Sequence, residues 1–170
     1  MKITRSLAPL RTEFFATLHR SETNSAAIAY TDTVADERIT ASDLDDIDCR
    51  VGFFGITYHY LVKPSGQIEI GRDPRTFTSR GNKAFNYSEI WIGVIGGRDE
   101  QANRISTITP AQREAVEELM QRIADCLQVP LEVNDMVENR TLRDQQAEAD
   151  ETEERMEALL DANEATARFG

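Results

Sequence analysis

Few side chains in this 170-residue chain can bind a transition metal or act as an activated nucleophile. The only histidines are His19 and His59, and the only cysteines are Cys49 and Cys126. A catalytic zinc site needs several His, Cys or carboxylate ligands and an open position for water. A Ser/His or Cys/His pair would have to use one of the two histidines, and their spacing supports neither arrangement. The residue inventory therefore argues against a nucleophilic pair and leaves few His and Cys ligands for a zinc site.

The remaining reactive groups point to no other chemistry. Both cysteines fall on predicted helices without an electropositive neighbourhood, so we expect buried free thiols. The many carboxylates could pair as in a glycosidase, but we expect them on exposed helix faces. Gly71, Gly96 and Gly97 do not follow the pattern of a phosphate-binding loop.

Length and charge narrow the class of protein. A chain of this length fits one domain with a real hydrophobic core. The net charge of −11 argues against general binding to nucleic acid or to an anionic membrane, because both need basic patches. We expect no signal peptide at the N-terminus and no segment that crosses a bilayer.

Five segments are typical of strands, and they predict a central sheet. Residues 56–62 are β-branched and aromatic, and residues 67–70 alternate across a turn at Pro64 and Gly66. Residues 90–95 form an apolar run that suits a strand covered on both faces. Residues 26–30 predict a short buried strand, and residues 130–133 predict an edge strand because Pro130 cannot donate a backbone hydrogen bond.

Two helices have clear start signals. Thr40 precedes a segment with Leu44, Ile47 and Val51 at helical spacing, which Gly52 ends; Asp43, Asp45, Asp46 and Asp48 are expected on its solvated face. Thr109 and Gln112 predict a capping box around Pro110. The apolar stripe of this second helix contains Val116, Leu119, Met120, Ile123 and Leu127.

The two ends of the chain are patterned differently. Phe14, Phe15 and Leu18 could pack against the sheet from a weakly patterned N-terminal segment. From Arg143 onward there are nine acidic residues against three arginines, or −6 of the total charge. This segment has strong helix propensity and a thin apolar stripe containing Met156, Leu159, Leu160 and Ala167.

Several motifs in order resemble the type-2 N-acetylmuramoyl-L-alanine amidases, relatives of the peptidoglycan recognition proteins. Within that family the likeness is greatest to the small lysozyme-amidases of podoviral phages, which also bind and inhibit the phage RNA polymerase. The resemblance spans residues 12–142. The motifs that carry it are Tyr58-His59-Tyr60, Gly71-Arg72, Phe85-Asn86, Gly96-Gly97 and Thr109-Pro110-Ala111-Gln112.

The resemblance implies a zinc ion held by two histidines and a cysteine, but this sequence departs from that set. The first histidine position falls at Tyr30 or Thr31, and the second falls at Asn134 or Asp135. The cysteine position falls at Leu142, and the assisting lysine falls near Arg140. The assisting tyrosine is retained as Tyr58. We therefore expect no zinc, no cofactor and no catalytic residue. A substitute Mg²⁺ or Ca²⁺ site using Asp32 and Asp135 is the remaining metal alternative.

The resemblance implies a single α/β domain, with a mixed sheet of about five strands flanked by helices. We expect an N-terminal extension at 1–25, an amidase-like domain at 26–142 and an acidic C-terminal helix at 143–170. The expected function is non-catalytic binding of a protein, possible partners being the phage RNA polymerase or virion proteins, with the C-terminal helix as a contact. The alternatives are a structural component of the virion and residual peptidoglycan binding or amidase activity. Either the host cytoplasm or the virion fits this reading.

Overall fold

The computed structural model describes residues 3–5, 10, 22–78, 80, 88–128 and 130–169, with only the backbone at 153, 154 and 157–169. The predicted docking of Phe14, Phe15 and Leu18 lies outside the described residues, as does the Phe85-Asn86 motif. Among the helices described, none is long and apolar enough to cross a membrane.

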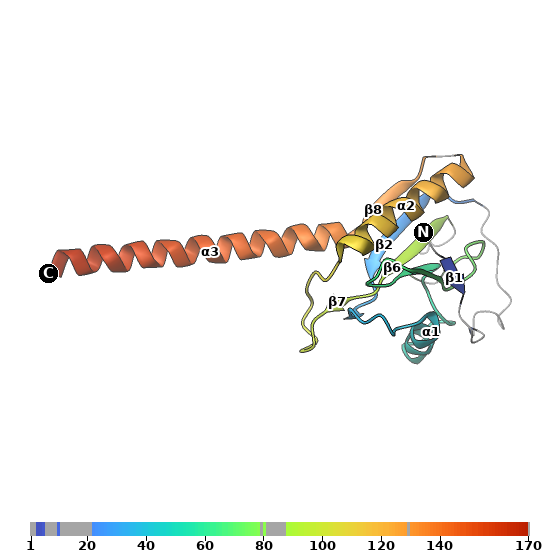
Figure 1. Cartoon of the computed structure of the whole chain (residues 1–170), viewed down its shortest axis with the longest axis horizontal. Coiled ribbons are helices and arrows are strands. Elements are labelled where there is room, and N and C mark those ends of the chain that lie inside the picture. Colours follow the sequence, from blue (N-terminus) through green and yellow to red (C-terminus); the bar gives the residue numbers. More distant parts are fainter. Residues whose placement is uncertain are drawn as a thin grey trace.

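A six-stranded mixed sheet forms the centre of the domain (Figure 1). Its strand order is β1-β5-β4-β6-β2-β8. Only the β4–β5 hairpin is antiparallel, and the other neighbours are parallel. The strands are β1 (Ile3–Arg5), β2 (Ser25–Tyr30), β4 (Tyr60–Val62), β5 (Ile68–Ile70), β6 (Glu89–Val94) and β8 (Glu132–Asp135).

The predicted α/β fold is confirmed, and the sheet has one strand more than expected. The additional strand is β1, which lies in the segment predicted to be an extension and pairs in parallel with β5. Its three residues alternate without an apolar run, so periodicity did not reveal it. A separate two-stranded parallel sheet joins β3 (Thr33–Val34) to β7 (Gly97–Arg98), immediately beyond the ends of β2 and β6.

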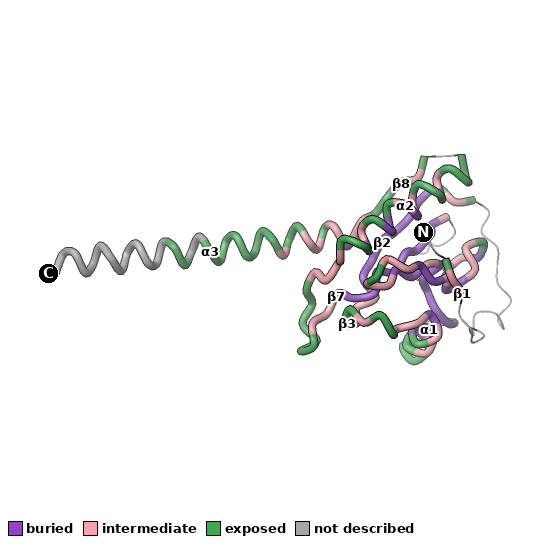
Figure 2. Tube along the Cα trace, viewed as in Figure 1, coloured by how far each residue is buried: buried purple, intermediate pink, exposed green. Residues whose placement is uncertain are grey.

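Helices cover both faces of the sheet, and two hydrophobic clusters fill the space between the layers. On one face, α2 (Pro110–Leu127) and the first turn of α3 (Met136–Phe169) pack against β2, β4 and β6 through residues such as Leu119 and Val137. On the other face, α1 (Ala41–Arg50) packs through Leu44 against Tyr58 and Trp91. Figure 2 shows the buried strands lying between these layers.

Both predicted helix starts are confirmed. Thr40 and Asp43 form a capping box at α1, and Thr109 and Gln112 form one at α2. Gln112 is fully buried, and its side-chain Nε2 also donates to the carbonyls of Val62 and Ile95, at 3.0 and 2.9 Å. A cap built from sequence-local residues therefore also ties α2 to the sheet.

The inner face of α1 differs from the prediction. Asp45 and Asp48 are buried, whereas Ile47 and Val51 are 43% and 67% exposed. The buried carboxylates accept hydrogen bonds from the backbone N–H groups of Ile56 and Thr57, each at 2.7 Å. A carboxylate can be buried when it accepts such bonds, so the solvated acidic face predicted for this helix is wrong at these two positions.

The C-terminal helix begins at Met136, seven residues before the predicted boundary, and runs away from the domain (Figure 1). Its base contacts β2, whereas residues 145–152 are exposed. The two cysteines lie on α1 and α2 as predicted, but neither is buried: Cys49 is intermediate and Cys126 is exposed. Their thiols are free.

Candidate functional site

Tyr30, the residue at the first expected metal-ligand position, is a packed structural side chain at the end of β2. Its phenol oxygen accepts hydrogen bonds from the backbone N–H groups of Thr107 and Ile108, both at 3.1 Å, and shares another with Ser106 Oγ. The guanidinium carbon of Arg140 lies 4.8 Å from the centre of its ring. Tyr30 thus joins β2 to the segment before α2, and its ring packs against the guanidinium group of Arg140 on α3.

Asp32 lies two residues after Tyr30 and binds arginines from two other parts of the chain. Its carboxylate pairs with Arg140 at 3.3 Å and with Arg104 at 3.0 Å. Its backbone carbonyl accepts from Arg98 Nε at 3.0 Å. Arg140 also donates to the carbonyl of Gly97 at 3.2 Å. A guanidinium–carboxylate cluster therefore links the ends of β2 and β6 to the base of α3.

Tyr58, the retained family position, lies beneath a second arginine. The guanidinium carbon of Arg80 is 4.3 Å from the Tyr58 ring centre, within the range of a cation–π contact. Tyr58 donates its hydroxyl hydrogen to the carbonyl of Tyr30 at 3.0 Å. Burial raises the pKa of Tyr58 far above its usual value. Its phenol therefore stays neutral at physiological pH and is used as a structural donor.

Arg80 is itself held in place from α1. Its Nε donates to Thr57 Oγ1 at 2.9 Å, and its Nη2 lies 3.9 Å from the Asp48 carboxylate. Asp48 also accepts from the hydroxyl of Thr57 at 2.7 Å. The chain Asp48–Arg80–Tyr58 was missed by sequence reasoning, because its members are far apart in sequence and apolar periodicity does not report buried carboxylates.

His59 makes hydrogen bonds to the backbone through both ring nitrogens. Its Nδ1 accepts from the backbone N–H of Trp91, and its Nε2 donates to the carbonyl of Thr76, each at 2.9 Å. The side chain is fully buried. Since a metal-binding nitrogen needs a free lone pair, this histidine is structural.

The other family positions are likewise engaged in packing or turned outward. Thr31 Oγ1 bonds Thr33 Oγ1 at 2.8 Å and accepts from the Gly96 N–H at 3.3 Å. Asp135 accepts from the backbone N–H of Glu138 at 2.8 Å and so caps the start of α3. Leu142 is 53% exposed. The structure therefore brings together Tyr30, Tyr58 and Arg140, whereas Leu142 is turned outward.

The residues present do not fit the zinc ion that the family resemblance implies. The first ligand position holds a tyrosine with a full set of hydrogen bonds, and Leu142 has no atom that can bind a metal. Among the residues that the structure describes, no group of three or more His, Cys, Asp or Glu side chains could hold an ion. Asp32 pairs with arginines and Asp135 caps a helix, so both carboxylates of the alternative Mg²⁺ or Ca²⁺ site already have other partners.

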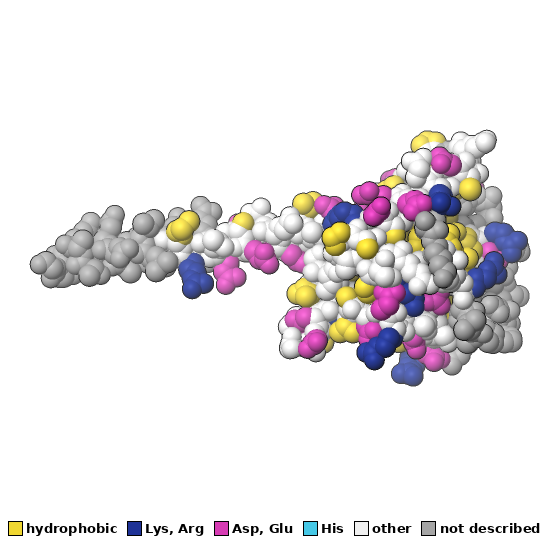
Figure 3. All heavy atoms as spheres, viewed as in Figure 1, with side chains coloured by type: hydrophobic (Ala, Val, Ile, Leu, Met, Phe, Trp, Pro, Cys, Tyr) yellow, Lys and Arg dark blue, Asp and Glu magenta, His cyan; other side chains and the backbone are white. Residues whose placement is uncertain are grey.

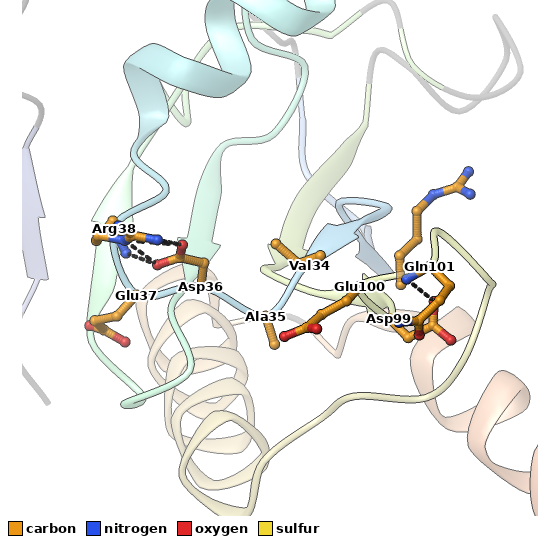
Figure 4. A pocket seen from close by; sticks show the side chains of 9 residues that line it. Val34, Ala35, Asp36, Glu37, Arg38, Asp99, Glu100 and Gln101 are labelled. Atoms are coloured by element: carbon orange, nitrogen blue, oxygen red, sulfur yellow. Dashed lines mark hydrogen bonds and ion pairs between the residues drawn. The ribbon is translucent and has the colours of Figure 1, made fainter.

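A shallow polar groove of about 650 Å³ lies beside this cluster, between residues 34–38 and 98–101 (Figure 4). Its charged groups are largely satisfied by their neighbours. Arg38 pairs with Asp36 at 2.7 Å, and the Asp99 carboxylate accepts from the backbone N–H groups of Gln101 and Asn103. The charges of Asp36, Arg38 and Asp99 are therefore satisfied by neighbouring groups.

Comparison with known proteins gives a consistent picture. No protein-family model matches the chain. It is 24% identical to the endolysin of Escherichia phage T7 over 101 residues, which cover 59% of this chain and 66% of that protein. It is 30% identical to the endolysin of Enterobacteria phage T3 over 69 residues, covering 41% and 45%. The matched segments thus span less than two thirds of the length of these relatives.

Solved structures extend the likeness to nearly the whole domain. The N-acetylmuramoyl-L-alanine amidase LysC from Clostridium intestinale superposes with a TM-score of 0.59 at 22% identity, covering 82% of this chain and 85% of that one. Drosophila PGRP-LB superposes with a TM-score of 0.63 at 14% identity, covering 79% and 81%. This chain has the amidase and peptidoglycan recognition fold. The family resemblance predicted from the motifs is confirmed, with phage endolysins as sequence relatives.

The Gly71-Arg72 motif has a structural role in this fold. Gly71 approaches the Tyr58 carbonyl so closely that an added Cβ would lie 2.5 Å from its oxygen. The neighbouring Arg72 is buried and donates to the carbonyls of Phe54 and Ile56, at 2.7 and 2.9 Å. These contacts give both residues a structural role in the frame of the fold.

Proposed function

We propose that this amidase-fold chain acts by binding another protein and does not cleave peptidoglycan. The observation that carries the proposal is Arg140, whose guanidinium rests on Tyr30 and pairs with Asp32 at the end of β2. The family resemblance assigns a metal ligand to that strand end. A positive guanidinium group there disfavours a second cation, and the nearby side chains are already used in hydrogen bonds.

The phage RNA polymerase is the first partner that we propose. The small phage lysozyme-amidases, which the chain resembles, include polymerase inhibitors, and a binding role of this kind needs no metal. The direct test adds the purified chain to transcription by the polymerase of the same phage. We expect inhibition that saturates and a complex that can be recovered by pull-down. Unchanged transcription at saturating protein, with no polymerase recovered, would reject this partner.

A virion component is the second candidate, and the projecting α3 favours it. Residues 145–152 of this helix are exposed, so they offer a contact surface separate from the domain. Mass spectrometry of purified particles tests the idea. The chain should be present at a defined copy number, and its absence from particles would end this candidate.

Residual peptidoglycan binding or amidase activity is the third candidate. Zinc content per chain, measured after purification without a chelator, separates it from the other two. We expect a content far below one ion per chain. A stoichiometric ion would revive the enzymatic alternative, because metal binding of this kind is worth on the order of 10 kcal/mol.

A further inference from the structure

The projecting helix α3 has a heptad pattern, although its composition is strongly acidic. Taking Leu142 as position a, the a positions are Leu142, Ala149, Met156 and Asn163, and the d positions are Gln145, Thr152, Leu159 and Thr166. None of these eight residues is charged, although 12 of the 28 residues from 142 to 169 are. Four of the eight, Leu142, Ala149, Met156 and Leu159, are apolar. Apolar residues at a and d are the pattern of a helix that pairs with another helix.

The acidic residues are placed away from this seam. Seven of the nine acids from Arg143 onward fall at positions b, c and f, which point away from a partner helix in a two-stranded coil. The remaining two are Glu148 at g and Glu153 at e. The helix can therefore pair with another acidic helix without burying charge.

The described side chains leave the seam open. Leu142 and Met156 are 53% and 62% exposed, and Ala149 between them is also exposed. The domain contacts a different side of the helix, through Val137, Arg140 and Thr141. Figure 3 shows α3 projecting from the domain beyond its base. An isolated helix of this kind is only marginally stable in water, so pairing along the seam would stabilise it.

We propose that a second copy of this chain covers the seam, with the two α3 helices antiparallel. In the antiparallel register that pairs Ala149 with Thr152 of the second copy, Glu148 comes closest to Arg155 of the second copy, twice per dimer. Both side chains are exposed. In a parallel pair, Glu148 would instead face Glu153 of the second copy, with like charges opposed. Charges at e and g set the orientation of such coils.

The antiparallel arrangement also keeps the two domains apart. In this register Met136 of one copy lies opposite Ala165 of the second copy, so the helix bases are separated by about 29 residues, or roughly 44 Å of helix at 1.5 Å per residue. A parallel pair would place both domains at the same end, beside Leu142. The charge pattern and the room for the domains favour the same orientation.

Sedimentation analysis of the full chain over about a hundredfold range of concentration tests the proposal, because dimer formation follows mass action. We expect a monomer–dimer equilibrium. Ala149→Asp, on the seam, should abolish the dimer, while Ala147→Asp, at the outward f position, should leave it intact. The two variants add the same charge to the same helix. A monomer at every concentration, or equal behaviour of the two variants, would overturn the proposal.

Charge exchange tests the orientation. Glu148→Arg and Arg155→Glu should each weaken the dimer by about tenfold, since each places like charges opposite one another. The double variant should restore the dimer, because it exchanges the two members of each cross-helix pair. A double variant no tighter than the single ones would overturn the antiparallel register. Circular dichroism of each variant should show unchanged helix content in the domain.

Discussion

The arginine at the base of α3 is the residue that most clearly separates this chain from a zinc amidase. Arg140 contacts Tyr30, Asp32 and the Gly97 carbonyl, and thereby joins two strand ends to a helix. Its planar group makes a stacked contact and several hydrogen bonds together, which a lysine could not reproduce. We therefore assign Arg140 a structural role at the place where the family resemblance implies a zinc ion.

Arg140→Ala should lower the free energy of unfolding by about 1–3 kcal/mol, because it removes a cation–π contact and charge-assisted hydrogen bonds. Urea denaturation followed by tryptophan fluorescence measures the change. Arg143→Ala is the matched control, since Arg143 lies on the same helix and is exposed. Equal stability of the two variants would contradict the structural role of Arg140.

Glu89 provides a pH-dependent test at the opposite end of the sheet. It is buried, and burial raises the pKa of its carboxyl, with Glu132 acting in the same direction. A raised folded-state pKa means that the ionised form destabilises the fold, so this contribution worsens as pH rises through the folded pKa. Glu89→Gln should therefore raise the melting temperature at pH 7, with a gain that shrinks toward about pH 4.

The exposed Glu117 supplies the control for this experiment. Glu117→Gln should change the melting temperature little at either pH, because its side chain lies on the solvent side of α2. A gain in melting temperature from Glu89→Gln that is larger at pH 4 than at pH 7 would contradict the raised pKa assigned to Glu89.

At the scale of elements, local signals predicted where α1 and α2 begin better than they predicted which face of α1 is buried. The capping boxes at Thr40 and Thr109 use residues only three positions apart, so the sequence contains their whole physical cause. The orientation of α1 depends on distant backbone N–H groups at Ile56 and Thr57, which draw Asp45 and Asp48 inward. Hydropathy patterns do not contain that information.

Gln112→Ala should destabilise the chain by about 2–3 kcal/mol. The change removes a helix cap and takes the buried Nε2 donor from the carbonyl of Ile95 and from that of Val62, which keeps only the backbone N–H of Ile95. Gln121→Ala, on the exposed side of the same helix, is the matched control and should be close to neutral. Chemical denaturation of both variants measures the difference, and a loss below about 0.5 kcal/mol for Gln112→Ala would contradict this account.

The candidate site was predictable only as a set of departures from the family. The resemblance located Tyr30, Tyr58 and Arg140, and the structure brings these three together. It did not indicate Asp32 as the partner of two arginines, because Arg104 and Arg140 are far from it in sequence. It also did not indicate that α3 begins at Met136, which turns Leu142 outward.

At the scale of the whole molecule, the chain combines an amidase-fold domain with a helix that extends from it. The helix is fixed to the domain near its base, by Arg140 and by Asp144, which accepts from the Ser106 N–H at 2.7 Å. Residues 145–152, beyond this base, are exposed, so we expect them to contribute little to the stability of the domain.

A chain that ends after Gln146 should therefore keep its fold. We expect a melting temperature within about 3 °C of the full chain at low protein concentration, where association contributes little. Scanning calorimetry measures it. A fall of about 10 °C or more would show that the outer part of α3 supports the domain, against the arrangement described.

Hydrolysis of purified peptidoglycan with zinc supplied in excess tests the central claim most directly, with an active phage endolysin as the positive control. If Arg140 and its neighbours have replaced the metal site, the chain should release no more soluble fragments than buffer does, at any zinc concentration. Zinc-dependent release of fragments that a chelator abolishes would contradict the account.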